Sequence, residues 1–223
     1  MVLFSGGLDS YCISKLVRPD INLYVDTRSK YSDLEIKNLP SVDNLVIDRR
    51  LDLSRQQKGA FVPARNAYLA LIASSYGETI ILGSMEGDVA GDHGDDFAEI
   101  TTDLLNKIYE PQYWLPEGRR FQVLTPYSTF TKSELIKMYL LAGYPPKPLS
   151  TLVSCYSGDS VACGTCKACE RKWVALTLNG IPCTFETDPA LNLSKKLPQM
   201  TLIERQEATK ALALSGVSCT VGS

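Results

Sequence analysis

The chain opens with short hydrophobic runs separated by glycine, proline and polar residues, a pattern typical of buried β-strands. Between some of these runs, apolar residues recur with a helical period. The period is clearest over 65–77, where Leu69, Ile72, Ala73 and Tyr76 share one face. Alternating strands and helices predict an α/β fold with a doubly wound, mostly parallel sheet. The predicted strands are residues 1–4, 21–27, 44–48, 79–84 and 121–127.

Further helices are predicted along the chain, at 11–17, about 97–109, 131–142 and 202–215. The third of these opens with Thr131-Lys132-Ser133-Glu134, a capping-box pattern. A proline-rich linker, GYPPKPLS, follows that helix. We therefore expect three parts: an α/β domain over 1–148, a small helical cysteine module over 149–185, and a tail over 186–223 with one helix.

Polar and glycine residues lie at the carboxyl ends of three predicted strands: Ser5–Ser10, Asp26-Thr27 and Gly83-Ser84. In an open parallel sheet the carboxyl ends of the strands meet at one edge, and ligands bind beyond that edge. The three segments are therefore expected to lie there together.

Overall charge narrows the range of partners. The 23 basic and 25 acidic residues give a net charge of −2 and a pI near 5.5, which argues against strong nucleic-acid binding. No apolar run approaches the ~18 residues of a membrane helix, and no signal-peptide pattern precedes the first strand. A cytoplasmic protein without membrane contact is expected.

The turn SGGLDS, residues 5–10, combines glycines and hydroxyls between a strand and a helix start. Backbone N–H groups of such a turn converge on one point, and the helix dipole adds positive charge there, so the turn predicts an anion site. It lacks the lysine and spacing of a Walker A loop. The alternative is an ordinary glycine turn with a capping serine.

Four of the seven cysteines are crowded into 15 residues with the spacing C-x₇-C-x₂-C-x₂-C. Four thiolates in one loop segment can enclose a tetrahedral ion, so Cys155, Cys163, Cys166 and Cys169 predict a structural Zn²⁺ site. A redox pair or an iron–sulfur cluster is the alternative. Cys12, Cys183 and Cys219 are interpreted as small hydrophobes.

Taken together, these motifs resemble a known family. SGGLDS matches the SGGxDS loop of the N-type ATP pyrophosphatases (the PP-loop superfamily), which cleave ATP between its α- and β-phosphates. The order SGGLDS, FVPARN at 61–66, TPY…KSEL at 125–135 and SCYSG…CGTCKACERK is similar to the 7-cyano-7-deazaguanine synthase (QueC) family of queuosine biosynthesis. The resemblance covers residues 1–185.

The resemblance implies an ATP-dependent ligase that adenylates the carboxylate of 7-carboxy-7-deazaguanine and lets ammonia attack, ending in a nitrile. It implies ATP with Mg²⁺, structural Zn²⁺ and a homodimer. Arg65, Asn66 and Lys132 are the implied catalytic residues, although a water-facing Arg65 or Lys132 is the alternative. Val62, Pro63, Asp95 and Glu99 are the implied substrate-binding residues. ATP is implied to bind at Phe4, Ser5, Gly6, Gly7, Leu8, Asp9 and Ser10.

Two regions depart from the family pattern. Over residues 88–100 the family has D-[YF]-S-G-Y-P-D-C-R-P-E-F, whereas Asp88, Gly91, Asp95 and Glu99 match only with one extra residue, and the arginine is missing. His93, the single histidine, is a candidate proton shuttle or simply exposed. The tail could contact a protein partner or cover the site.

These departures keep other functions open. The enzyme could stop at the amide, or join the deazaguanine to another amine such as a protein N-terminus, in phage DNA modification or antiviral defence. A tRNA-thiolating enzyme of the same superfamily is a third interpretation. The last is a catalytically inactive nucleotide-binding zinc scaffold.

Overall fold

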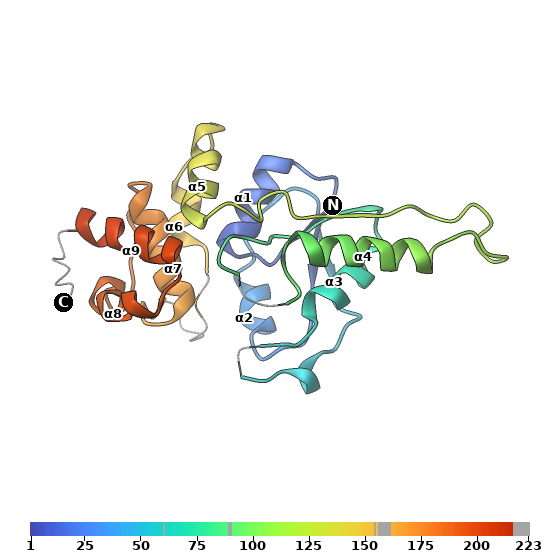
Figure 1. Ribbon diagram of the computed structural model, residues 1–223, viewed down its shortest axis with the longest axis horizontal. Helices are drawn as coiled ribbons and strands as arrows, with labels where there is room; N and C mark the ends of the chain where they lie inside the picture. The colour runs from blue at the N-terminus through green and yellow to red at the C-terminus, as the bar shows by residue number, and fades with distance from the viewer. Residues whose placement is uncertain (60, 89–90, 154, 156–161, 216–223) are drawn as a thin grey trace. The chain divides into compact units, whose positions relative to one another are not determined.

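The computed structural model describes residues 1–59, 61–88, 91–153, 155 and 162–215. The chain divides into two compact units, Met1–Phe130 and Thr131–Ser223 (Figure 1). The division predicted after residue 148 falls later than this boundary, and the three-part organisation stays a prediction. Among the described residues, no helix has the length and apolar character needed to cross a membrane.

The first unit is built on five parallel strands in the order β3-β2-β1-β4-β5. This confirms the predicted α/β class, and each strand lies inside the range predicted for it. The strands are β1 (Val2–Leu3), β2 (Asn22–Val25), β3 (Leu45–Asp48), β4 (Thr79–Ile81) and β5 (Gln122–Leu124).

Helices connect successive strands of this sheet. Right-handed crossovers place α1 and α2 on one face and α3 and α4 on the other, because the direction of winding reverses after β3. Figure 1 shows α3 beside α4, and the two helices are in contact. The helices of this unit are α1 (Leu8–Val17), α2 (Ser32–Lys37), the 3₁₀ helix η1 (Ser54–Gln56), α3 (Arg65–Ala73) and α4 (Gly94–Ile108).

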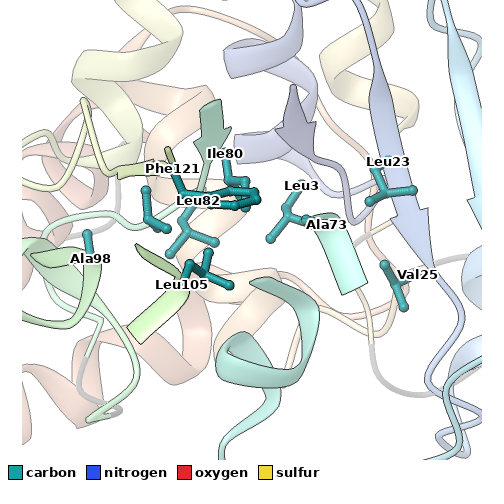
Figure 2. Close-up of a cluster of buried hydrophobic side chains, with 10 residues drawn as sticks. Leu3, Leu23, Val25, Ala73, Ile80, Leu82, Ala98, Leu105 and Phe121 are labelled. Carbon is teal, nitrogen blue, oxygen red and sulfur yellow. The ribbon is translucent and has the colours of Figure 1, made fainter. Parts of the chain in front are cut away.

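The main core lies between the sheet and the layer formed by α3 and α4. Figure 2 shows side chains from the strands, including Leu3, Leu23 and Ile80, gathered with Ala73 of α3 and Leu105 of α4. Positions i and i+2 of one strand share a face, so Val2, Phe4, Tyr24 and Ile81 face the other way, and these are buried too. Burial of both faces explains why the strands read as continuous apolar runs.

The second unit is helical. The predicted capping box forms at α5, where the Thr131 hydroxyl accepts from the Glu134 amide. The tail contains α8 as well as the predicted α9, and both pack on α7 through a core that includes Trp173, Leu193 and Leu212. The elements are α5 (Lys132–Leu141), α6 (Lys147–Thr151), α7 (Lys167–Leu178), α8 (Pro189–Lys196), the 3₁₀ helix η2 (Leu197–Gln199) and α9 (Leu202–Leu214).

Candidate functional site

The SGGLDS turn joins β1 to α1 at the carboxyl end of the central strand. Ser10 closes the turn: its hydroxyl accepts from the Ser5 amide at 3.2 Å and donates to the Gly7 carbonyl at 3.1 Å. The N-cap of α1 is Gly7, which has no side chain that could cap the helix. The first N–H groups of a helix lack intrahelical partners, so the turn offers backbone donors to an anion.

Gly6 is required by the geometry of this turn. Its φ of +74° lies in the left-handed region, and a Cβ there would come 2.7 Å from Leu39 Cδ2. Leu39 follows α2, so the segment after α2 packs directly on the turn. Any larger residue at position 6 would strain the backbone and displace Leu39.

The predicted edge forms as expected. Phe4–Ser10 follows β1, Asp26-Thr27 follows β2, and Gly83-Ser84 follows β4. Strand order reverses between β1 and β4, and the crevice at such a reversal is where open α/β sheets bind ligands. The SGGLDS turn therefore stands beside the expected ligand crevice.

The segment FVPARN leads into α3. Val62 is buried, Pro63 and Arg65 are exposed, and Asn66 is 9% exposed. Asp92, a residue that the sequence analysis did not single out, contacts Asn66 twice: its Oδ2 accepts from the Asn66 backbone N–H at 2.9 Å, and its carbonyl accepts from Asn66 Nδ2 at 2.7 Å. Two segments that the resemblance assigns to substrate are thus joined.

The loop that departs from the family pattern runs from β4 into α4 and is tied to neighbouring backbone. Met85 N–H donates to Asp88, and Gly94 N–H donates to the Ser84 hydroxyl. The second bond gives a partner to the first N–H group of α4, which begins at Gly94, three residues before the predicted start. His93 lies 3.9 Å from both the Asp88 and Asp92 carboxylates. Val89 and Ala90 lie outside the described residues.

Asp95 and Glu99 are both exposed on α4. Asp95 Oδ1 accepts from the Thr125 hydroxyl at 2.5 Å and the Ser128 hydroxyl at 2.8 Å. These bonds lower the pKa of the Asp95 carboxyl below its ordinary value. Asp95 is therefore a carboxylate held to the loop after β5.

A hydrogen-bonded carboxylate after β2 also escaped the sequence analysis. Glu35 of α2 accepts from the Tyr24 hydroxyl at 2.9 Å. Burial raises the pKa of Glu35, whereas the bond from Tyr24 and the charge of Arg65 oppose the rise. Glu35 therefore belongs to the electrostatic surroundings of Arg65. Its short helix, six residues long, has too few turns to show a period.

Lys132 belongs to the second unit, where it is the first residue of α5. It lies between Thr131 and Ser133, whose hydroxyls both donate to Glu207 Oε1 of α9. The Asn179 side chain of α7 donates to the Ser133 carbonyl at 3.0 Å. The backbone around Lys132 is thus held by two other helices.

The four clustered cysteines converge in the second unit. All four Sγ atoms lie within 4.8 Å of one another, and Cys163 and Cys169 Sγ are 3.9 Å apart. Tetrahedral Zn²⁺ with Zn–S bonds of about 2.3 Å places sulfurs roughly 3.8 Å apart. The donor set and spacing therefore fit a metal ion such as zinc. Residues 154 and 156–161, within this motif, lie outside the described part, as does Cys219.

Backbone geometry explains how the cysteine loop closes. Gly164, at φ +78°, lies so close to the Thr187 carbonyl that a Cβ would clash with it. Thr187 N–H donates to the Cys163 carbonyl at 3.2 Å. Although burial opposes the shift, hydrogen bonds from the hydroxyl and amide of Thr165 lower the pKa of the Cys163 thiol to about 6. A thiol with a lowered pKa is a ready metal ligand.

The two remaining cysteines that the structure describes lie outside this cluster. Cys12 is fully buried, and Cys183 is half-buried against the core formed by α7, α8 and α9. Both positions agree with their interpretation as small hydrophobes.

Five parallel strands, a glycine turn at the strand-order reversal and a four-cysteine cluster define an α/β protein of the PP-loop type. A family model described as "Queuosine biosynthesis protein QueC" matches residues 35–180. The chain belongs to the QueC family.

Known relatives agree with this membership, at a distance. The 7-cyano-7-deazaguanine synthase of Chlorobium luteolum is 29% identical over 85% of this chain and 97% of that protein. The enzyme of the same name from Acidobacterium capsulatum is 31% identical over 76% of this chain and 87% of its own length. For Methanothermobacter thermautotrophicus the identity is 28% over 65% of this chain and 62% of that protein. The chain is a divergent member of the family.

Proposed function

We propose that the protein is an ATP-dependent carbon–nitrogen ligase that converts 7-carboxy-7-deazaguanine to 7-cyano-7-deazaguanine with ammonia. The observation that carries the proposal is the SGGLDS turn at the carboxyl end of β1, closed by Ser10 beside the strand-order reversal. Membership of the QueC family and the names of the relatives support the substrate.

Activation is the difficult step, because the negative charge of a carboxylate repels nucleophiles. In the proposed reaction a carboxylate oxygen attacks the α-phosphorus of ATP, and the bond to the β-phosphate breaks to release pyrophosphate. The turn from Phe4 to Ser10 binds the phosphates through backbone N–H groups. Asp9 holds the Mg²⁺ that accompanies ATP. Lys132 stays a predicted phosphate contact.

Amine attack follows. Ammonia forms a bond to the carbonyl carbon, loses a proton, and AMP leaves, giving the amide. Arg65, exposed at the start of α3, stabilises the developing negative charge, and Asn66 positions the reacting groups. Val62, Pro63, Asp95 and Glu99 contact the deazaguanine. A second ATP adenylates the amide oxygen as pyrophosphate leaves and the nitrogen loses a proton. Loss of the second proton and of AMP then gives the nitrile.

The four cysteines are proposed to hold a zinc ion with a structural role. Cys155, Cys163, Cys166 and Cys169 would use all four positions of a tetrahedral ion, leaving none for substrate. Zinc would then fix the loop before α7. It would take no part in the chemistry.

A second candidate product has support in the sequence. Residues 88–100 lack the arginine and prolines of the family pattern, and Asp95 is bonded to Thr125 and Ser128. An altered substrate loop favours an enzyme that stops at the amide or transfers the deazaguanine to another amine, such as a protein N-terminus. Such a product would place the enzyme in DNA modification or antiviral defence.

Product analysis tests these proposals. Purified protein is incubated with ATP, 7-carboxy-7-deazaguanine and ammonium, and the products are identified by mass spectrometry. A nitrile supports the ligase, whereas an amide or a protein adduct supports the second candidate. Absence of pyrophosphate release would favour an inactive scaffold. Arg65→Ala is expected to lower turnover at least about a hundredfold, and Arg55→Ala, an exposed arginine of η1, serves as its control.

The expected homodimer also stays a prediction. Light scattering coupled to gel filtration measures the mass in solution. A mass of twice the 24.6 kDa chain would support it.

A further inference from the structure

The start of α3 lacks a cap of its own. Ala64, its N-cap, adopts φ +55°, a left-handed conformation that is uncommon for alanine, and makes no side-chain capping bond. The first N–H groups of a helix need partners from outside the helix. The partners of these N–H groups therefore come from outside the helix.

Asp92 supplies that partner from 26 positions further along the chain. Its carboxylate accepts from the Asn66 backbone N–H, and its own carbonyl accepts from the Asn66 side chain. The Asp92 side chain is only 13% exposed, so both bonds are shielded from water. A carboxylate at a helix N-terminus is also stabilised by the helix dipole.

The loop that carries Asp92 is itself held in place on both sides. Ser84 fixes the backbone of Gly94, Asp88 fixes that of Met85, and Asp95 is bonded to the loop after β5. A contact from an anchored loop restrains its partner more than a contact from an unanchored one. Asp92 therefore couples the exit of β4 to the start of α3.

The bond from Nδ2 also fixes the orientation of the Asn66 side-chain amide. Because Nδ2 must donate to the Asp92 carbonyl, Oδ1 is the amide atom turned away from Asp92. An amide oxygen accepts hydrogen bonds, and an amine nucleophile has N–H groups to donate. Asn66 oriented in this way suits an amine rather than an anion.

We infer that Asp92 is a positioning residue: it holds Asn66 so that the Asn66 Oδ1 atom accepts from the attacking amine. The inference rests on the proposed function, which places Asn66 at the reacting carboxylate. Asp92 touches no substrate. Asp92 lies in the segment that departs from the family pattern, so this coupling belongs to the divergent part of the chain.

Steady-state kinetics test the role of Asp92. Asp92→Ala is expected to lower kcat/KM for ammonium about tenfold to a hundredfold, the range expected for loss of a charge-assisted hydrogen bond. KM for ATP should stay within about twofold, because the SGGLDS turn is untouched. Asp92→Asn keeps an oxygen acceptor and should recover most of the loss. Asp96→Ala, an exposed neighbour on α4, is the control.

Two further measurements separate positioning from a general loss of structure. In an Asn66→Ala background, Asp92→Ala should lower kcat/KM for ammonium little further. A merely structural role predicts that the losses in kcat/KM of the two single variants add. Hydrogen exchange of the Asn66 amide should speed up about tenfold or more in Asp92→Ala and stay unchanged in Asp96→Ala.

The outcomes for the two proposals can be told apart. A wild-type protein that makes no product would contradict the proposed function and, with it, the role given to Asn66. An active wild type whose Asp92→Ala variant keeps its ammonium kinetics would overturn the inference alone. Equal losses of kcat/KM for ATP and for ammonium in Asp92→Ala would also overturn the inference.

Discussion

Single residues decide whether the SGGLDS turn can form. Gly6 is the clearest case, since its left-handed φ strains any side chain there and a Cβ would also force the Leu39 side chain to shift. The pattern SGGLDS already indicates a need for glycine. The contact with Leu39, by contrast, depends on the path of the chain after α2 and is visible only in the structure.

Replacing Gly6 tests the turn directly. Gly6→Ala is expected to lower pyrophosphate release at least about a hundredfold, because backbone strain and the clash with Leu39 move the N–H donors. Adding Leu39→Ala removes the clash but keeps the strain, so it should restore part of the activity. Unchanged turnover in Gly6→Ala would contradict a phosphate-binding role for the turn.

Asp48 illustrates a residue with a structural role at the same edge of the sheet. Its side chain is 1% exposed and accepts from Arg50 at 2.6 Å and from the Tyr76 hydroxyl at 2.8 Å. The bond from Arg50 is the main reason why the pKa of Asp48 lies below its ordinary 3.8. This pairing ties the end of β3 to the residues after α3.

The pKa of Asp48 predicts how stability depends on pH. A carboxyl whose folded pKa is lowered stabilises the fold above its unfolded pKa, and the contribution is lost as pH falls through the folded pKa. Asp48→Asn should cost about 1–3 kcal/mol near pH 7 and less near pH 3, measured by urea unfolding. Asp43→Asn, whose side chain is 95% exposed, should cost little at either pH.

At the scale of elements, the sequence predicts the positions of helices better than it predicts the tertiary contacts that stabilise them. The capping box of α5 is local and is readable from Thr131 and Glu134. The second anchor of α5 is Glu207 of α9, which accepts from the Thr131 and Ser133 hydroxyls across 76 and 74 positions. Residues of the tail therefore complete the start of a helix that precedes the cysteine module.

Loss of this anchor should be visible as loss of stability. Glu207→Ala leaves two hydroxyls without their acceptor and is expected to destabilise the second unit by about 1–3 kcal/mol. Hydrogen exchange at the start of α5 measures the local effect. Gln206→Ala, on the exposed side of α9, is the matched control and should leave exchange unchanged.

For the molecule as a whole, the fold class and the family follow from the sequence, and the three-part division of the chain stays a prediction. The compact units meet at Phe130 and Thr131, which places α5 with the cysteine cluster. The proline-rich stretch GYPPKPLS leads into the short helix α6. Contacts of α5 with α7 and α9 explain this placement.

Metal content should control the order of the cysteine module. We expect one zinc ion per chain by elemental analysis, and we expect Cys163→Ser or a strong chelator to remove it. Faster hydrogen exchange in α7, whose N-cap is Cys166, should accompany the loss. Cys183→Ser is the control, because Cys183 lies outside the cluster. If the amides of α7 stayed fully protected from hydrogen exchange after metal removal, a structural role for zinc would be contradicted.

The sequence by itself determined the five strands, the SGGLDS turn, the clustering of the four thiols and the capping box of α5. Each of these depends on residues that are close together in the chain, where period, spacing and backbone preference act directly. The short helices α2, α6 and α8 were missed because five to eight residues carry too little periodicity to predict a helix.

Only the tertiary structure decided which distant groups meet. Strand order, the Asp92–Asn66 pairing, the Glu207 anchor and the approach of Thr187 to Gly164 all join segments separated by at least 20 positions. The paths of the loops and the packing between layers determine which segments meet, and no local sequence pattern specifies either of them. For this reason the candidate site residues could be named from local motifs, whereas the contacts that Asp92 and Glu207 make were visible only in the structure.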